Sequence, residues 1–119
     1  MKTNQEALKL AALHFTGAIL WVNELDDCTP SEELIDKSYQ KILKFTINNT
    51  ELVDQYGGTT SQFGHSFALS ILGTGCGFCD DMSTTEENRE ALHDAAVAIQ
   101  EELSVYAKAD LVYPDLWRQ

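Results

Sequence analysis

Apolar residues recur three and four positions apart through the N-terminal half of the chain, which is the spacing of amphipathic helices. The first helix is expected to start at a capping box formed by Thr3 and Glu6 and to run to about residue 22. The second is expected to start with Thr29 as its N-cap and Pro30 in its first turn, where a residue without an N–H is tolerated. The asparagine pair at 48–49 predicts a break in this helix.

The pattern changes from a helical period to alternation in the stretch 63–79. Phe67, Leu69 and Ile71 alternate with small residues, which predicts a strand, and residues 73–75 supply the glycines of a turn. The residues after this turn are expected to return as a second strand, so that the stretch forms a β-hairpin.

A third helix and a final strand follow the expected hairpin. Ser83 and Glu86 match another capping box, and the apolar stripe that begins there continues to Tyr106. Residues 111–113 are β-branched, apolar or aromatic and predict a short strand, which Pro114 ends.

These elements predict the α+β class, with two N-terminal helices, a β-hairpin, a third long helix and a short C-terminal strand in a small antiparallel sheet. We expect one domain over residues 1–119, since a chain of this length forms a single core. Within it we expect a helical half at 1–56 and a ββαβ half at 63–113.

The composition excludes several classes of protein. Apolar residues make up 44% of the chain, which is typical of a globular protein and not of a disordered one. Nineteen acidic residues against eight basic ones give a net charge of −11, which disfavours direct binding to nucleic acids or to anionic membranes. No secretory signal is apparent and the three cysteines are too few for a disulfide scaffold, so we expect a cytoplasmic protein.

Residues 65–80 resemble the signature of a family of small acidic bacteriophage and prophage proteins of uncharacterised function. The stretch reads His-Ser-Phe-Ala-Leu-Ser-Ile-Leu-Gly-Thr-Gly-Cys-Gly-Phe-Cys-Asp, and the family signature is approximately His-Asp-Phe-Trp-Leu-Thr-Arg-Asn-Gly-His-Gly-Ala-Gly-Phe-Trp-Asp. The matching positions are His65, Phe67, Leu69, Gly73, Gly75, Gly77, Phe78 and Asp80. The resemblance implies a viral origin, a location in the cytoplasm of a bacterial host and a similar order of elements. The family's Arg and His are replaced by Ile71 and Thr74, so it implies no catalytic pair here.

The cysteines and histidines are the candidates for metal or redox chemistry. Cys76 and Cys79 have the C-x-x-C spacing, and together with Cys28 and His65 they would supply the four ligands of a zinc site. The acids that follow Cys79 would raise the thiol pKa values, which disfavours a redox role. The familiar hydrolase, nucleotide-binding and metalloprotease motifs are absent from the sequence. The sequence therefore predicts no catalytic residue, and zinc in the alternative above is the only cofactor that it offers.

The acidic residues are concentrated toward the C-terminus, where residues 80–119 contain ten acids and three bases. We expect an acidic surface that binds a basic site on a host protein, which would inhibit or redirect a nucleic-acid-handling or defence protein. The alternatives are a metal or thiol protein that uses Cys76 and Cys79, and a virion or assembly component. Self-association is left open, through a hairpin edge or through Leu116-Trp117. The acids expected to face the partner are Glu86, Glu87, Glu90, Glu101 and Glu102.

Overall fold

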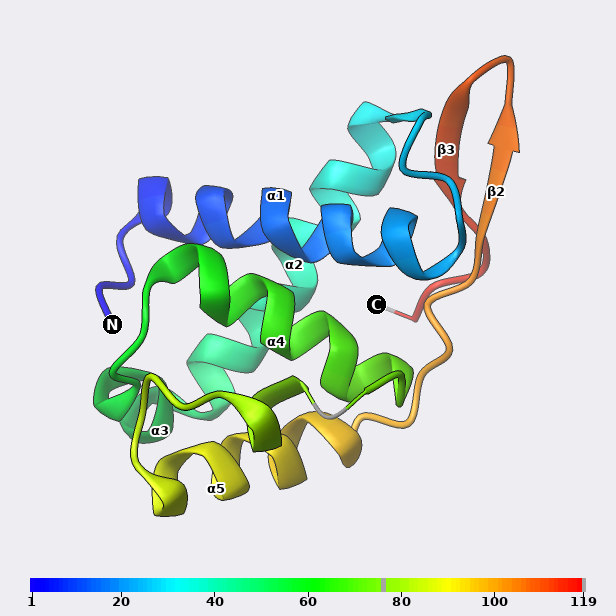
Figure 1. Cartoon of the computed structure of the whole chain (residues 1–119). Helices are drawn as coiled ribbons and strands as arrows, with labels where there is room; N and C mark the ends of the chain where they lie inside the picture. The colour runs from blue at the N-terminus through cyan, green and yellow to red at the C-terminus, as the bar shows by residue number, and fades with distance from the viewer. Residues whose placement is uncertain (76, 119) are drawn as a thin grey trace.

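The computed structural model describes residues 1–75 and 77–118, and these residues form a mixed α/β fold with five α-helices and a small three-stranded sheet (Figure 1). The prediction of a mixed α and β structure is confirmed, but the arrangement of the elements differs from the expected one. In chain order the elements are α1 (Gln5–Val22), β1 (Thr29–Pro30), α2 (Glu32–Asn48), α3 (Thr50–Gln55), α4 (Thr60–Leu72), the 3₁₀ helix η1 (Gly77–Asp80), α5 (Glu86–Val97), β2 (Val105–Lys108) and β3 (Leu111–Pro114).

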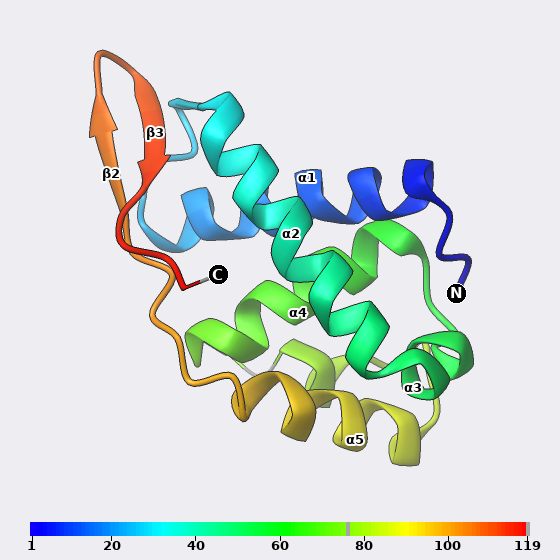
Figure 2. The same ribbon diagram turned by 180° about the vertical axis from the view of Figure 1, so that it is seen from behind.

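The helices pack around a core of phenylalanine side chains. Helix α1 lies along α4, α2 crosses behind both, and α5 lies on the other side of α4 (Figures 1 and 2). The aromatic rings form a continuous cluster, with centroids 4.3 Å apart for Phe45 and Phe67 and 5.4 Å apart for Phe63 and Phe78. These rings are almost entirely buried, so this cluster carries a large share of the hydrophobic stabilisation.

Helices α1 and α4 approach each other closely at Gly64. A β-carbon built on Gly64 would lie only 2.0 Å from the carbonyl oxygen of Ala11. Glycine is therefore required at this position because of helix packing and not because of backbone conformation.

The sheet is mixed and has the strand order β1-β3-β2. Strand β1 is parallel to β3, and β2 is antiparallel to it. The two-residue loop between β2 and β3 has positive φ at both central residues, 53° at Ala109 and 67° at Asp110, as a type I′ hairpin turn requires. The strand predicted at 111–113 is confirmed, but its hairpin partner is residues 105–108 and not the stretch 63–79.

The predicted hairpin at 63–79 is wrong, because most of this stretch forms α4 and η1. Thr59 is the N-cap of α4 and forms a capping box with Gln62, while Gly73 ends the helix in the left-handed conformation at φ 69°. The fully buried residues Phe63, Phe67 and Ala68 recur at helical spacing, so the alternation of large and small residues was a misleading signal.

Three other helix boundaries differ from the predictions. The N-cap of α1 is Asn4 and not Thr3, because the side chain of Asn4 accepts the hydrogen bond from the backbone N–H of Ala7. Thr29 and Pro30 form β1, and α2 begins after the N-cap Ser31, whose side chain accepts a hydrogen bond from the backbone N–H of Leu34. The third predicted helix, α5, starts after the N-cap Thr85 and ends at Val97 without continuing to Tyr106. Pairing of residues 105–108 with β3 takes Tyr106 out of any helix. The break at 48–49 is confirmed.

Candidate functional site

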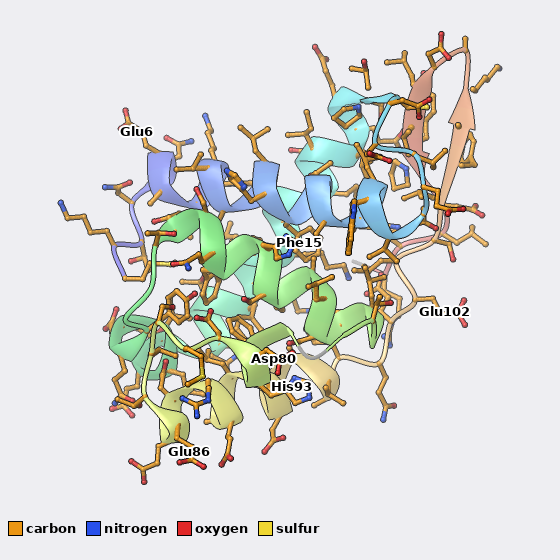
Figure 3. All side chains as sticks on the ribbon, viewed as in Figure 1. Glu6, Phe15, Asp80, Glu86, His93 and Glu102 are labelled. Carbon is orange, nitrogen blue, oxygen red and sulfur yellow. The ribbon has the colours of Figure 1, made fainter. Side chains whose placement is uncertain are left out.

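Four exposed carboxylates lie on the outer side of α5. At 100° per residue, Glu86, Glu87, Glu90 and Asp94 fall within a sector of about 100° of the helix. The opposite side of the helix is buried and includes Leu92. We call these four residues the α5 acidic face, and Figure 3 shows Glu86 pointing outward from the first turn.

Two features of the local sequence, the N-cap and the acids of the first turn, fix where the α5 acidic face begins. Thr85 caps the helix by accepting a hydrogen bond from the backbone N–H of Asn88. Acids in the first turn, here Glu86 and Glu87, interact favourably with the positive end of the helix dipole. The buried side of α5 contacts η1, α4 and α3, which leaves the carboxylates toward solvent.

The prediction that Glu101 faces a partner is wrong. Its side chain is only 7% exposed and forms an ion pair with Lys41, while its second oxygen accepts a hydrogen bond from the backbone N–H of Arg118 at 3.0 Å. Glu102 is exposed but lies beyond the end of α5, away from Glu86 (Figure 3). The five predicted residues therefore do not share one surface, and Asp94, the fourth member of the face, was not among them.

None of the four carboxylates of the α5 acidic face forms an ion pair with another described residue. Within residues 1–75 and 77–118, both ion pairs involve Glu101, whose partners are Lys41 and Arg118. Basic residues gather elsewhere, because Lys37, Lys41, Lys44 and Arg118 all line one hollow beside α2. Half of the eight basic residues of the chain are thus in one place. Arg89, the basic residue of α5, donates a hydrogen bond to the backbone carbonyl of Thr84.

The residues that carry the family resemblance divide into two groups. Phe67 and Phe78 are fully buried in the aromatic core. Gly73, Gly75 and Gly77 all have positive φ, and a β-carbon on Gly77 would lie 2.5 Å from the carbonyl oxygen of Ser66. These five residues therefore hold the turn between α4 and η1.

The other three matching residues, His65, Leu69 and Asp80, line a surface hollow of about 640 Å³. His14 of α1 also lines it, so the structure brings together two of the three histidines that the sequence places on separate elements. The part of the chain that the structure describes contains no cluster of three or more His, Cys, Asp or Glu side chains able to hold a metal ion. The zinc alternative stays a prediction, because Cys76, one of its four expected ligands, lies outside the described residues.

A buried carboxylate, Asp81, anchors the floor of this hollow. It accepts hydrogen bonds from the hydroxyls of Tyr56, Ser66 and Ser83 and from the backbone N–H of Ser83. Burial raises the pKa of a carboxyl group, but these hydrogen bonds outweigh it and lower the pKa of Asp81. Burial and the bond to Asp81 together raise the pKa of Tyr56. The network connects the end of α3, α4 and the segment after η1. It stabilises the fold because each of these buried polar groups has a hydrogen-bond partner.

Ser70 and His93 form a pair that has the elements of a nucleophile and a base. The Ser70 hydroxyl lies 3.1 Å from Nδ1 of His93. Ser70 is 1% exposed, however, and its oxygen accepts a hydrogen bond from the backbone N–H of Phe78 at 3.0 Å. Because no substrate can reach this hydroxyl, Ser70 does not act as a nucleophile. Its hydrogen bonds instead join α4 to α5 and η1.

The metal and thiol alternatives that use Cys76 and Cys79 stay predictions, because the structure describes only one of these two cysteines. Cys76 lies outside the described residues, and Cys79 is half-buried in η1. Cys28 is a half-buried free thiol in the loop between α1 and α2, beside β3. Partial burial and the neighbouring carboxylates of Asp27 and Asp110 raise the pKa of Cys28, which makes its thiol less reactive at neutral pH.

No protein-family model, curated protein or solved structure matches the chain. The proposed function therefore depends on the geometry of the structure. Among the described residues no helix is long and apolar enough to cross a membrane.

Proposed function

We propose that this protein is a non-enzymatic accessory protein of the phage type that binds a basic surface of a host protein through the α5 acidic face. The observation that carries the proposal is the set of four exposed, unpaired carboxylates in one sector of α5. Such a surface complements a basic groove and accelerates association through long-range attraction.

The charge distribution supports a protein partner over a nucleic acid. The net charge of −11 repels phosphate backbones, and the basic residues beside α2 are partly occupied internally, since Lys41 pairs with Glu101. A host protein that handles nucleic acids carries the kind of basic groove that one acidic helix face fits. Its inhibition or redirection is the function that we assign to the complex.

The test is affinity capture from a nuclease-treated bacterial lysate with graded salt washes, followed by mass spectrometry. The test variant reverses the first two charges of the face, Glu86→Lys and Glu87→Lys. The control variant is Glu32→Lys and Glu33→Lys, because these exposed acids occupy the same first two positions of α2 behind their own N-cap. Both variants change the net charge and the helix-dipole interaction equally.

We expect one stoichiometric protein that elutes as salt rises, is lost by the α5 variant and is kept by the α2 variant. Equal loss in both variants would mean that net charge alone governs binding, and equal retention would mean that the partner binds another surface. Either result contradicts the proposal that α5 is the binding element.

A further inference from the structure

Two adjoining hollows beside α2 gather half of the basic side chains of this acidic protein. The hollow lined by Lys37, Lys41, Lys44 and Arg118 has a volume of about 330 Å³, and we call it the basic hollow. A second hollow of about 330 Å³, the α2–α5 hollow, lies between α2 and the end of α5 and shares Lys41, Lys44 and Arg118 with the first. Sites for small molecules have volumes of about 300–1,000 Å³, so the pair has the size of such a site.

The cations of the basic hollow come from two distant parts of the chain. At 100° per residue, its three lysines fall within a sector of about 60° on one side of α2. Arg118 reaches the same place from the C-terminal segment, where its Nη2 donates hydrogen bonds to the carbonyl oxygens of Ile99 and Gln100. These bonds hold the guanidinium in one orientation beside the lysines.

Internal contacts hold part of this cluster and leave other donors for a ligand. Glu101 pairs with Lys41, and Nε of Arg118 lies 3.7 Å from the same carboxylate oxygen. Within residues 1–75 and 77–118, the side-chain contacts of Arg118 use Nη2 and Nε, which leaves its Nη1 to bind a ligand. Lys37 pairs with no carboxylate of the described residues. Four cations and two carboxylates, Asp36 and Glu101, line the two hollows, which gives them a net charge of +2.

The α2–α5 hollow adds an apolar floor and an exposed side-chain amide to these cations. Its apolar lining residues are Phe45, Ala95, Ala98 and Ile99. Asn48 also lines it, and an asparagine amide can bind the edge of an adenine base because it offers a donor and an acceptor together. Lys41 and Asn48 are about 10 Å apart along α2, a distance that an extended mononucleotide spans.

We propose that the two hollows together bind a free nucleoside monophosphate, with its phosphate in the basic hollow and its base in the α2–α5 hollow. A phosphate monoester carries about two negative charges at neutral pH, which match the net charge of the hollows, and guanidinium and ammonium groups bind it through charged hydrogen bonds. A nucleic-acid strand is disfavoured, because its further phosphates would lie over the acidic surface of a chain of charge −11. None of the four carboxylates of the α5 acidic face lines either hollow, so this site is separate from the proposed protein interface.

Isothermal titration calorimetry of the whole chain with the four common nucleoside 5′-monophosphates tests the site. We expect at least one of them to bind with one molecule per chain, and about tenfold or more tightly than inorganic phosphate or the matching nucleoside, because each of these fills only one hollow. Absence of binding for all four nucleotides at millimolar concentration overturns the proposal. Equal affinity for a nucleotide and for either of its two halves also overturns it.

A lysine substitution tests the place of the phosphate. Lys37→Gln removes one cation from the basic hollow and is expected to weaken nucleotide binding about tenfold, because a charged hydrogen bond is lost. The control is Lys108→Gln on β2, which is exposed and makes the same change of net charge. Equal affinities for the two variants would mean that the basic hollow does not hold the phosphate, which contradicts the proposal.

A second pair of variants tests the place of the base. Ala98→Phe fills the apolar part of the α2–α5 hollow, whereas Val97→Phe adds a similar ring at the neighbouring exposed position, which does not line the hollow. We expect Ala98→Phe to weaken nucleotide binding about tenfold and to leave the affinity for inorganic phosphate unchanged, which also shows that the chain is still folded. Unchanged nucleotide affinity in Ala98→Phe, or equal weakening by Val97→Phe, overturns the assignment of the base to this hollow.

Discussion

Replacing Gly64 by alanine should destabilise the protein although alanine is the better helix former. In a helix, alanine is favoured over glycine by about 1 kcal/mol. At Gly64 the added methyl group would lie 2.0 Å from the carbonyl oxygen of Ala11 and 2.8 Å from its carbonyl carbon. The helices must separate by roughly 1.5 Å to restore a normal contact of about 3.5 Å, because backbone atoms cannot rotate away.

Gly17→Ala provides the matched control. Gly17 is also inside a helix, but nothing lies within 4 Å of the position that its β-carbon would take. We expect Gly17→Ala to raise the free energy of unfolding by about 0.5–1 kcal/mol. Overpacking costs about 1–3 kcal/mol, and separation of α1 from α4 also loosens the phenylalanine core, so we expect Gly64→Ala to lower it by about 2 kcal/mol.

Urea unfolding followed by far-UV circular dichroism measures the free energy of unfolding of both variants. Opposite signs for the two glycines are the predicted result. Equal stabilisation by both substitutions would refute the close approach of α1 and α4 at Gly64.

Three further predictions concern the polar network, the buried ion pair and the turn after α4. The folded pKa of Asp81 is lowered, so the contribution of this carboxylate to stability is present above the unfolded pKa of about 3.9 and is lost as pH falls through the folded pKa. The variant Asp81→Asn has no such carboxylate. Urea unfolding at a series of acidic pH values should therefore show a smaller loss of stability with falling pH for Asp81→Asn than for the wild type. Tyr56→Phe removes a donor to this carboxylate and should cost about 1.5–3 kcal/mol at neutral pH. Glu101→Gln leaves the largely buried ammonium of Lys41 without its charged partner, although the carbonyl of Arg118 still accepts a hydrogen bond from it, and should cost about 3 kcal/mol. Glu102→Gln, at an exposed position, should change stability by less than about 0.5 kcal/mol in the same assay. Gly77→Ala should lower the melting temperature more than Gly75→Ala, because both residues have positive φ but only Gly77 has backbone atoms within 3 Å of the added carbon.

The sequence predicted the N-terminal helices because strong local signals agreed with the packing there. The apolar stripe of α1 and the asparagine break after α2 are local features, and both appear in the structure. The short strand β1 was missed because its two residues, Thr29 and Pro30, pair with a segment about 80 residues away. Long-range pairing of this kind leaves no trace in a local pattern.

The hairpin error shows a conflict between two local signals. Alternation of Phe67, Leu69 and Ile71 suggested a strand, whereas the capping box of Thr59 and Gln62 indicated a helix start. The capping signal was the correct one, and the glycine at 73 marked the helix end. The real hairpin turns at Ala109-Asp110, which lacks the glycine that usually identifies such turns.

The candidate site was predicted in part for a related reason. The first-turn acids of α5 follow from sequence because a capped helix orients them. The burial of Glu101 could not be foreseen, since its partners Lys41 and Arg118 come from distant segments.

The most direct test of the proposed function is the affinity of the captured host protein, measured by titration against salt for the wild-type chain and the two charge-reversed variants. We predict that wild-type affinity falls steeply as salt rises. We also predict weak, nearly salt-independent binding for the variant Glu86→Lys with Glu87→Lys, and near wild-type behaviour for Glu32→Lys with Glu33→Lys. Wild-type affinity that does not change with salt, or equal affinity for all three chains, would contradict the α5 acidic face as the binding surface.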